Sequence, residues 1–244
     1  MTFAVTCDER FASSLPYVRR RIEAASAVKC RLAHEDDDTT LTVDGIGFRS
    51  SLLDALADVI ITDCKSFYIN EKIRLPIKDA LTRHAFTAAL STFDRTTDKI
   101  IAKTVLETMY NDGGVCNLSG IYEFCLGNLK SRWDEVVLLA NENICYLVCQ
   151  KTFNELLRFL ISNIESISDE AHIIGNNGGF EVVGAGLTPI DEVYINNELP
   201  NPIGVVCKLI AIAPKKIYLH IQEPTLIGQI KNLFGTSTVI SNLS

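Results

Sequence analysis

The stretch Ile217–Ile240, IYLHIQEPTLIGQIKNLFGTSTVI, carries the clearest information on the fold of this chain of 244 residues. Its first residues form an apolar run that predicts a strand over Ile217–Ile221. Pro224 then opens an amphipathic helix, and Gly235 marks its end. A second short strand follows over Ser237–Ile240. The order strand, helix, strand predicts a βαβ unit with two parallel strands and a right-handed crossover.

The residues before this unit predict a hairpin and a further helix. His172–Ile174 and Phe180–Val183 are apolar runs on either side of an Asn-Gly pair, which favours the positive φ angles of a tight turn. Val205–Ala213 predicts a short buried helix that ends at Pro214. We therefore expect a C-terminal α/β segment over residues 169–244.

The middle of the chain, residues 76–168, predicts helices at 77–93, 97–110 and 133–149. The clearest helix covers Thr152–Ile164, where large apolar side chains recur at helical spacing. They are Phe153, Leu156, Leu157, Leu160, Ile161 and Ile164. We expect this helix to be the central core element, packed against the C-terminal β segment.

The N-terminal residues 1–75 predict a small α/β segment. A strand over Thr2–Thr6 precedes a helix for which Ser14 is the expected N-cap. Two β-rich runs, 28–33 and 39–43, then predict a hairpin with an acidic turn.

A long helix is predicted from Arg49 to Arg74, because its apolar residues recur with a period of about 3.6. This pattern places Asp54 and Asp58 on the solvent side of the helix. The whole chain is thus predicted to have an α/β fold, with helices and strands mixed along the sequence (mixed α+β). We expect its three parts, a small α/β segment, a central helical region and a C-terminal hairpin with a βαβ unit, to pack as one or two domains.

The charge of the chain argues against binding to nucleic acids. The formal net charge is −7, from 23 basic and 30 acidic side chains. Proteins that bind DNA or RNA concentrate positive charge on one face, because the release of counterions from phosphates supplies much of the affinity. Here the basic clusters are Arg19–Arg21 and Lys215-Lys216. A nucleic-acid accessory role for these two patches is the weakest alternative.

The eight cysteines are spread through apolar runs, and the first residues lack the pattern of a signal peptide. We therefore expect a cytoplasmic protein with eight free thiols. No run approaches the roughly 18 apolar residues that a membrane-spanning helix needs. A chain of this length buries enough apolar surface to fold without disulfides.

The motifs that carry chemistry are weak in this sequence. Cys145 and Cys149 lie four apart on a predicted helix, yet no second pair of metal ligands accompanies them, so core packing is favoured. The loop Gly175–Gly179 lacks the Lys-Ser/Thr ending of a phosphate-binding loop. The acidic run Glu35–Asp38 lacks the spacing of a calcium loop and is favoured as a solvated turn.

The four histidines lie in separate predicted elements, and no serine carries a nucleophile motif. A Cys-His dyad that only the fold assembles stays open at this point. We assign no catalytic residue, cofactor or metal.

Two segments near the C-terminus, Ile212–His220 (IAPKKIYLH) and Ile230–Gly235 (IKNLFG), closely resemble the ending of the YtxC-like sporulation proteins of spore-forming Gram-positive bacteria. Gly120–Leu126 (GIYEFCL), the helix over 153–164 and the run 172–174 resemble that family in the same order. The resemblance implies a role connected with sporulation in a cytoplasm and no known reaction chemistry. It is carried in part by residues of unknown role: Ala213, Pro214, Lys215, Lys216 and His220.

We therefore expect a non-enzymatic cytoplasmic protein that acts through a protein partner. The alternative is a small-ligand-binding protein or enzyme that uses the C-terminal βαβ unit. Ligands of open α/β sheets favour the carboxyl ends of strands, here His220–Thr225 at a helix N-terminus. Glu223 would oppose an anion at this position.

Overall fold

The computed structural model describes residues 2–35, 37–74, 79–111, 114–143, 150–176, 178–190, 199–235 and 239–241. The chain forms two compact units, each built from two stretches of sequence. Unit 1 consists of Met1–Tyr68 and Asp94–Glu135, and unit 2 consists of Ile69–Phe93 and Val136–Ser244. The backbone therefore passes from one unit to the other three times.

Unit 1 contains a four-stranded sheet of order β2-β3-β1-β4. Its strands are β1 (Thr2–Asp8), β2 (Lys29–Glu35), β3 (Asp38–Asp44) and β4 (Val115–Asn117). The predicted hairpin is confirmed, because β2 and β3 pair antiparallel and β3 also pairs with β1. Alternate side chains of β1 and β3 fill the core face of the sheet: Phe3, Val5, Cys7, Leu41 and Val43.

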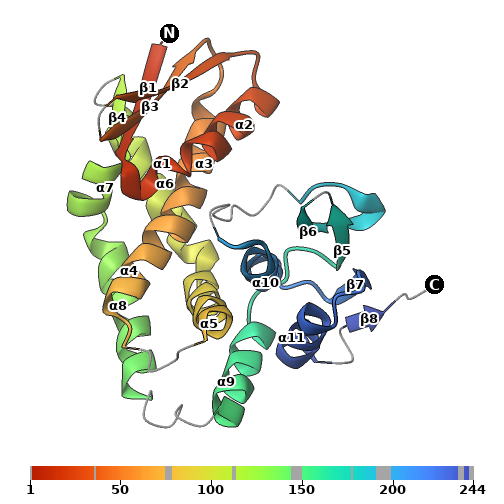
Figure 1. The fold of residues 1–244 in the computed structure, drawn as a ribbon. Helices are drawn as coiled ribbons and strands as arrows, with labels where there is room; N and C mark the ends of the chain where they lie inside the picture. Colours follow the sequence, from red (N-terminus) through yellow and green to blue (C-terminus); the bar gives the residue numbers. More distant parts are fainter. Residues whose placement is uncertain are drawn as a thin grey trace. The chain divides into compact units, whose positions relative to one another are not determined.

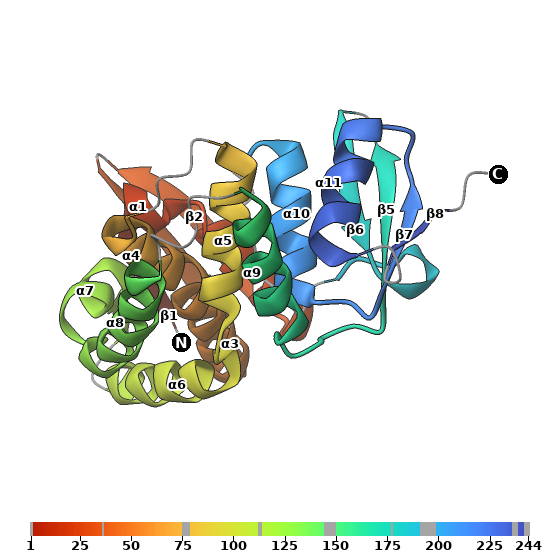
Figure 2. The ribbon, with the colours of Figure 1, turned by 90° about the horizontal axis from the view of Figure 1, so that it is seen from below.

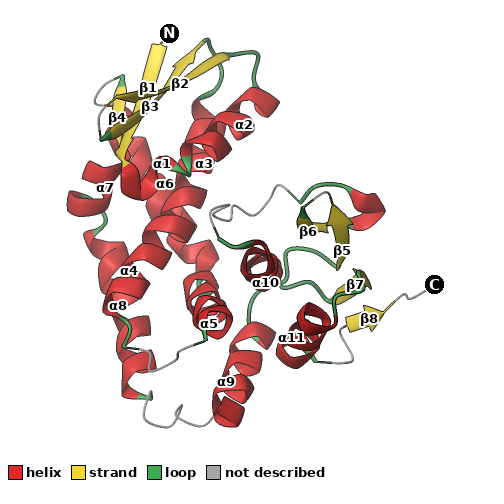
Figure 3. Ribbon diagram, viewed as in Figure 1, coloured by secondary structure: helices red, strands yellow, loops and turns green. Residues whose placement is uncertain are grey.

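The helices of unit 1 lie against one side of this sheet (Figures 1 and 3). They are α1 (Glu9–Ala12), α2 (Leu15–Ala25), α3 (Arg49–Val59), α6 (Arg95–Asn111), α7 (Leu118–Phe124) and the first parts of α4 (Lys65–Lys72) and α8 (Gly127–Glu142). The long helix predicted from Arg49 is confirmed as far as Lys72. It contains a π-helical turn, η1 (Ile60–Cys64), that joins α3 to α4.

One sequence expectation in unit 1 is confirmed in part and another is wrong. Ser14 is the N-cap residue of α2, but its side chain makes no capping hydrogen bond, and its hydroxyl donates a hydrogen bond of 2.6 Å to Asp63 of the π turn. Asp58 is buried and does not face solvent. Its carboxylate accepts hydrogen bonds from Lys99 at 2.6 Å and from the Tyr17 hydroxyl at 3.1 Å. Helices α2 and α6 both pack on α3 and supply these donors, so a second face of α3 is covered.

A second buried ion pair lies on the other side of the π turn. Lys65 Nζ lies 2.7 Å from Asp98 Oδ2, and both side chains are almost fully buried. Asp98 also accepts hydrogen bonds from the indole of Trp133 at 2.9 Å and from Arg132 at 3.1 Å. Burial lowers the pKa of Lys65, although Asp98 opposes the shift. The pair therefore joins α4, α6 and α8 through one desolvated carboxylate.

Replacement of Lys65 by methionine should destabilise the chain by about 3–5 kcal/mol, because it removes the buried cation from the Asp98 carboxylate and leaves only the partly exposed Arg132 to pair with it. Denaturant unfolding of the purified variant measures this loss. Lys103→Met is the matched control, since Lys103 pairs with Asp54 at a half-exposed position and should lose less than about 1 kcal/mol. Equal losses in the two variants would contradict the special role of the buried pair.

Unit 2 contains a second four-stranded sheet, of order β6-β5-β7-β8. Its strands are β5 (Glu170–Asn176), β6 (Gly179–Val183), β7 (Lys216–His220) and β8 (Val239–Ser241). The predicted hairpin is confirmed as β5 and β6, which pair antiparallel. The predicted βαβ unit is also confirmed, since β7 and β8 are parallel neighbours joined by α11 (Pro224–Phe234).

The helices of unit 2 form two layers on one side of its sheet, as Figure 2 shows. Next to the strands lie α10 (Asn201–Ile212) and α11, and beyond them lie α5 (Ala80–Thr92) and α9 (Gln150–Ser162). The 152–164 helix therefore contacts the C-terminal segment through α11, and α10 and α11 lie between it and the strands. α9 packs on α5 and α11 because the more apolar α10 takes the place beside the strands.

The apolar stripe of α9 is narrower than the sequence pattern predicted. Phe153, Leu157 and Ile161 are buried, whereas Leu156, Leu160 and Ile164 are only packed against the edge of the core. The ring of Phe153 contacts that of Phe86 on α5, with centroids 5.0 Å apart. α9 is thus a core helix on one face and a surface helix on the other.

Leu157→Ala should cost about 2–5 kcal/mol, because it opens a cavity at a fully buried position. Phe159→Ala on the same helix is the control. Its ring is 63% exposed, so the stability should change by less than about 1 kcal/mol. Thermal and denaturant unfolding of both variants checks this, and an unchanged midpoint for Leu157→Ala would show that α9 does not belong to the core.

A helix that spans a membrane must be both long and apolar. Within the described ranges, no helix has both of these properties. The sequence expectation of no membrane-spanning helix agrees with this finding.

Candidate functional site

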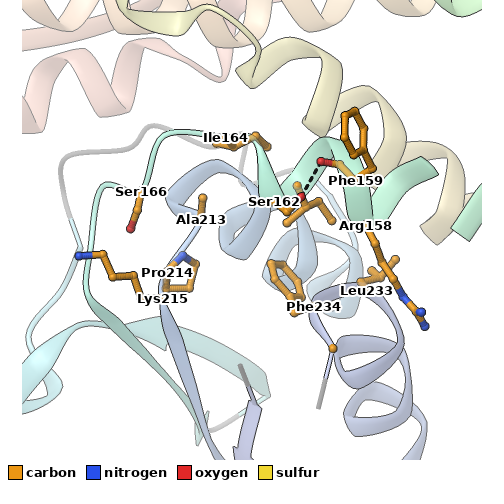
Figure 4. A pocket seen from close by; sticks show the side chains of 12 residues that line it. Arg158, Phe159, Ser162, Ile164, Ser166, Ala213, Pro214, Lys215, Leu233 and Phe234 are labelled. Atoms are coloured by element: carbon orange, nitrogen blue, oxygen red, sulfur yellow. Dashed lines mark hydrogen bonds between the residues drawn. The ribbon is translucent and has the colours of Figure 1, made fainter. Parts of the chain in front are cut away.

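A pocket of about 460 Å³ lies in unit 2 where the carboxyl ends of α9, α10 and α11 approach one another (Figure 4). Its apolar walls include Ile164, Pro214 and Phe234. Among the described residues, the charged side chains in its lining are Arg158 and Lys215, and none of the lining residues is an aspartate or a glutamate. The pocket therefore combines an apolar wall with two cations.

The polar side chains of the pocket are already engaged with the protein. Arg158 donates to the backbone carbonyl and to the side-chain oxygen of Asn232, the latter at 2.6 Å. Lys215 forms an exposed ion pair of 2.6 Å with Asp169, and this pairing lowers the pKa of Asp169. The Ser162 hydroxyl donates to the Phe159 carbonyl, as Figure 4 shows.

Helix geometry explains the sign of these charges. The carboxyl end of a helix carries a partial negative charge, and cations near it are stabilising. Arg158 interacts with the last turn of α11 in this way. A ligand with a carboxylate can still approach, because a guanidinium has five N–H donors and Arg158 is exposed.

The residues that carry the family resemblance fall at two separate places. Ala213, Pro214 and Lys215 line the pocket. Ala213 ends α10 with a left-handed backbone, φ 46° and ψ 56°, which residues with a Cβ adopt at a cost. Lys216 and His220 are the two ends of β7, and His220 does not line the pocket.

His220 instead meets a second histidine, which sequence reasoning placed in a separate element. His172 Nδ1 lies 3.0 Å from His220 Nε2 across the parallel strands β5 and β7. Tyr218 stacks on His172 with ring centroids 4.8 Å apart, and Glu170 lies 3.5 Å from the other ring nitrogen. Strand alternation was the signal that could have found this cluster, because all four residues share one face once β5 and β7 are in register.

The histidine pair is too small to hold a metal by itself. Among the residues that the structure describes, no group of three or more His, Cys, Asp or Glu side chains is placed to bind a metal ion. The two facing nitrogens can share one proton in a hydrogen bond, which requires at least one neutral ring.

The position proposed for the alternative function, at the carboxyl end of β7, is occupied by the chain itself. Glu223 caps α11, and its carboxylate accepts a hydrogen bond from the Leu226 backbone N–H. This hydrogen bond lowers the pKa of Glu223. An anionic ligand at this helix N-terminus would have to displace that carboxylate.

An apolar groove of about 210 Å³ lies among α5, α8 and α9, on the flank of α9 opposite the pocket. Its lining is apolar apart from Asn143. Two of its walls are open to solvent, since Phe93 is half exposed and Leu139 is 61% exposed. Large apolar side chains in such positions are typical of surfaces that bind other proteins.

Three of the cysteines in the described ranges are buried thiols with a raised pKa. The six cysteines placed there are free thiols: Cys7, Cys30, Cys64, Cys116, Cys125 and Cys207. Burial raises the pKa of Cys7, Cys116 and Cys207 to about 12, so these thiols stay protonated at neutral pH. The interpretation of Cys145 and Cys149 as core residues lies outside the described residues.

All eight cysteines should react with an alkylating reagent once the protein is unfolded without reductant. In the folded protein the half-buried Cys30 should react much faster than the fully buried Cys64, whose pKa burial raises. Mass spectrometry of the intact protein counts the labels. Fewer than eight labels after unfolding would reveal a disulfide and contradict the expectation of free thiols.

Comparison with known proteins gives no further assignment. Searches against protein-family models, curated proteins and solved structures found no match to this chain. The resemblance to the YtxC-like proteins therefore stays an expectation from the sequence.

Proposed function

We propose that this chain is a non-enzymatic cytoplasmic protein that acts through a protein partner, in the sporulation-associated role that the resemblance implies. The proposal rests on the outer surface of unit 2 around α9. There an apolar groove and a cationic pocket flank one helix, with exposed apolar side chains beside both.

The two flanks of α9 offer different chemistry to a partner. Leu156 and Leu160 line the groove, whereas Arg158 and Ser162 line the pocket. Phe159 belongs to the pocket lining and projects its ring to solvent. A partner that covers α9 would thus bury apolar side chains on one flank and approach two cations on the other.

These features fit a partner segment with apolar side chains next to carboxylates. An amphipathic helix can place its apolar side chains in a groove at positions i, i+3 and i+4. Acidic residues at one end of that helix would face Arg158 and Lys215, the two cations among the described lining residues, and would compete with Asp169 for Lys215. Apolar burial would then supply affinity, and the charges would supply orientation and association rate.

The test compares variants of the full chain as baits in sporulating cells, followed by reconstitution with the purified partner. Phe159→Asp and Leu139→Asp should each raise the dissociation constant of the complex about tenfold or more. The reason is that an aromatic or aliphatic side chain buried at an interface contributes about 1–2 kcal/mol to the binding free energy. Phe124→Asp is the matched control, since Phe124 in unit 1 is 87% exposed and outside the proposed surface. Isothermal titration calorimetry measures the dissociation constants.

Two results would contradict the proposal. One is a partner whose affinity is unchanged by both unit 2 variants. The other is a partner lost with Phe124→Asp alone. Lys215→Glu tests whether the partner segment is acidic. It should weaken the binding of an acidic segment and leave the binding of a neutral segment unaltered.

The alternative function, small-ligand binding by the C-terminal βαβ unit, is favoured by the volume of the pocket. About 460 Å³ falls in the range of sites for small molecules, and a carboxylate or phosphate would meet Arg158 and Lys215. A thermal-shift screen of nucleotides and carboxylic acids distinguishes the two functions. A reproducible shift that Lys215→Glu abolishes favours the ligand, and no shift together with a captured partner favours the protein.

A further inference from the structure

In the part of the chain that the structure describes, the two sheets have four edge strands, and three of them are protected. There β4 and β8 have three residues each, which leaves little backbone for another strand to pair with. β6 is covered by the chain itself. The side-chain amide of Asn201 accepts from the Phe180 N–H at 2.7 Å and donates to the Phe180 carbonyl at 2.9 Å. Val183 at the end of β6 also forms an isolated bridge with Pro189.

The edge strand β2 has none of these protections. It is seven residues long, without proline or glycine, and every side chain in it is exposed or half-exposed. In the described part of the chain its backbone makes no backbone hydrogen bond apart from the ladder with β3. An unpaired edge of this length is a template for a further strand.

The sequence of β2 is complementary to itself when reversed. Two copies of KCRLAHE placed antiparallel, with a two-fold axis through Leu32, set Lys29 opposite Glu35 of the second copy at both ends. Leu32 then faces Leu32 of that copy. Arg31 faces Ala33, with Glu35 on one diagonal and Arg31 of the second copy on the other. A register centred on Arg31 would instead set two arginines opposite each other, which is destabilising.

We propose that β2 is a homodimerisation edge, at which two copies of this chain join their unit 1 sheets into one continuous antiparallel sheet. The two-fold axis through Leu32 lets all seven residues of each strand pair. It also places Lys29 opposite Glu35 of the other copy at both ends of the paired strands. This inference is independent of the partner surface on unit 2.

Charge reversal tests the pairing. Sedimentation of the wild-type chain over a range of concentrations should show a monomer–dimer equilibrium. Lys29→Glu and Glu35→Lys should each raise the dimer dissociation constant about tenfold or more, because each places like charges opposite each other twice. The double variant Lys29→Glu/Glu35→Lys should return it to near the wild-type value. Both side chains are exposed, so the melting temperatures of diluted samples should not change.

Cross-linking tests the register. In a Cys30→Ser background, Leu32→Cys should form a disulfide between copies under mild oxidation, because Cβ atoms of directly opposed residues lie about 4.5–5.5 Å apart. Ala33→Cys in the same background is the control, since two such residues would be diagonal. Peptide mapping by mass spectrometry identifies the link. A wild-type chain that stays monomeric at hundreds of micromolar, or a dimer unaffected by both single charge reversals, would overturn the proposal.

Discussion

The buried contact between Lys65 and Asp98 is the interaction on which unit 1 depends. Removing two ions from water costs several kcal/mol each, and attraction alone repays that cost only when the remaining polar atoms are also satisfied. Here the indole of Trp133 and the guanidinium of Arg132 complete the coordination of the Asp98 carboxylate. Few alternative packings of α4, α6 and α8 would satisfy all of these groups. The pair therefore selects one arrangement of the three helices.

The π turn between α3 and α4 lies between Asp58 and Lys65, the two buried charged residues that form ion pairs with α6. Asp58 precedes the turn and is neutralised by Lys99, and Lys65 follows the turn and neutralises Asp98. Turns of this kind often occur where a helix must accommodate a functional or steric demand. In this chain the demand is electrostatic, because one long helix presents charges of both signs to the same neighbour.

The fold could be predicted best where its signals are local. The strand, helix and strand of the βαβ unit were recognised because a proline start, a glycine stop and the apolar periods all lie within a few residues. The burial of Asp58 could not be predicted in this way. Its partners Tyr17 and Lys99 are far away in sequence, and an aspartate in an amphipathic pattern normally faces water. The position of α9 was missed for a similar reason, since periodicity shows which face is buried but not which element buries it.

The candidate site could likewise be predicted only where its residues are neighbours in sequence. The sequence pattern marked Ala213, Pro214 and Lys215, which are neighbours in the chain and stay together in the pocket wall. It could not bring His220 to His172, because that contact depends on the register of two strands that α10 separates in sequence. The exposure of the Phe159 ring follows from the packing of α5 and α11 on the other faces of α9, which the sequence does not show.

The interleaving of the two units has a consequence for biosynthesis. Because synthesis runs from the N-terminus, α5 leaves the ribosome before any of the helices and strands that cover it in unit 2. The apolar side chains of Ala85, Phe86 and Ala89 stay exposed to water until α9 and α10 have been synthesised. Unit 1 cannot complete its fold until Glu135 has left the ribosome. The nascent chain thus exposes the apolar face of α5 until α9 and α10 have been synthesised, and exposed apolar surface of this kind makes a folding intermediate prone to aggregation.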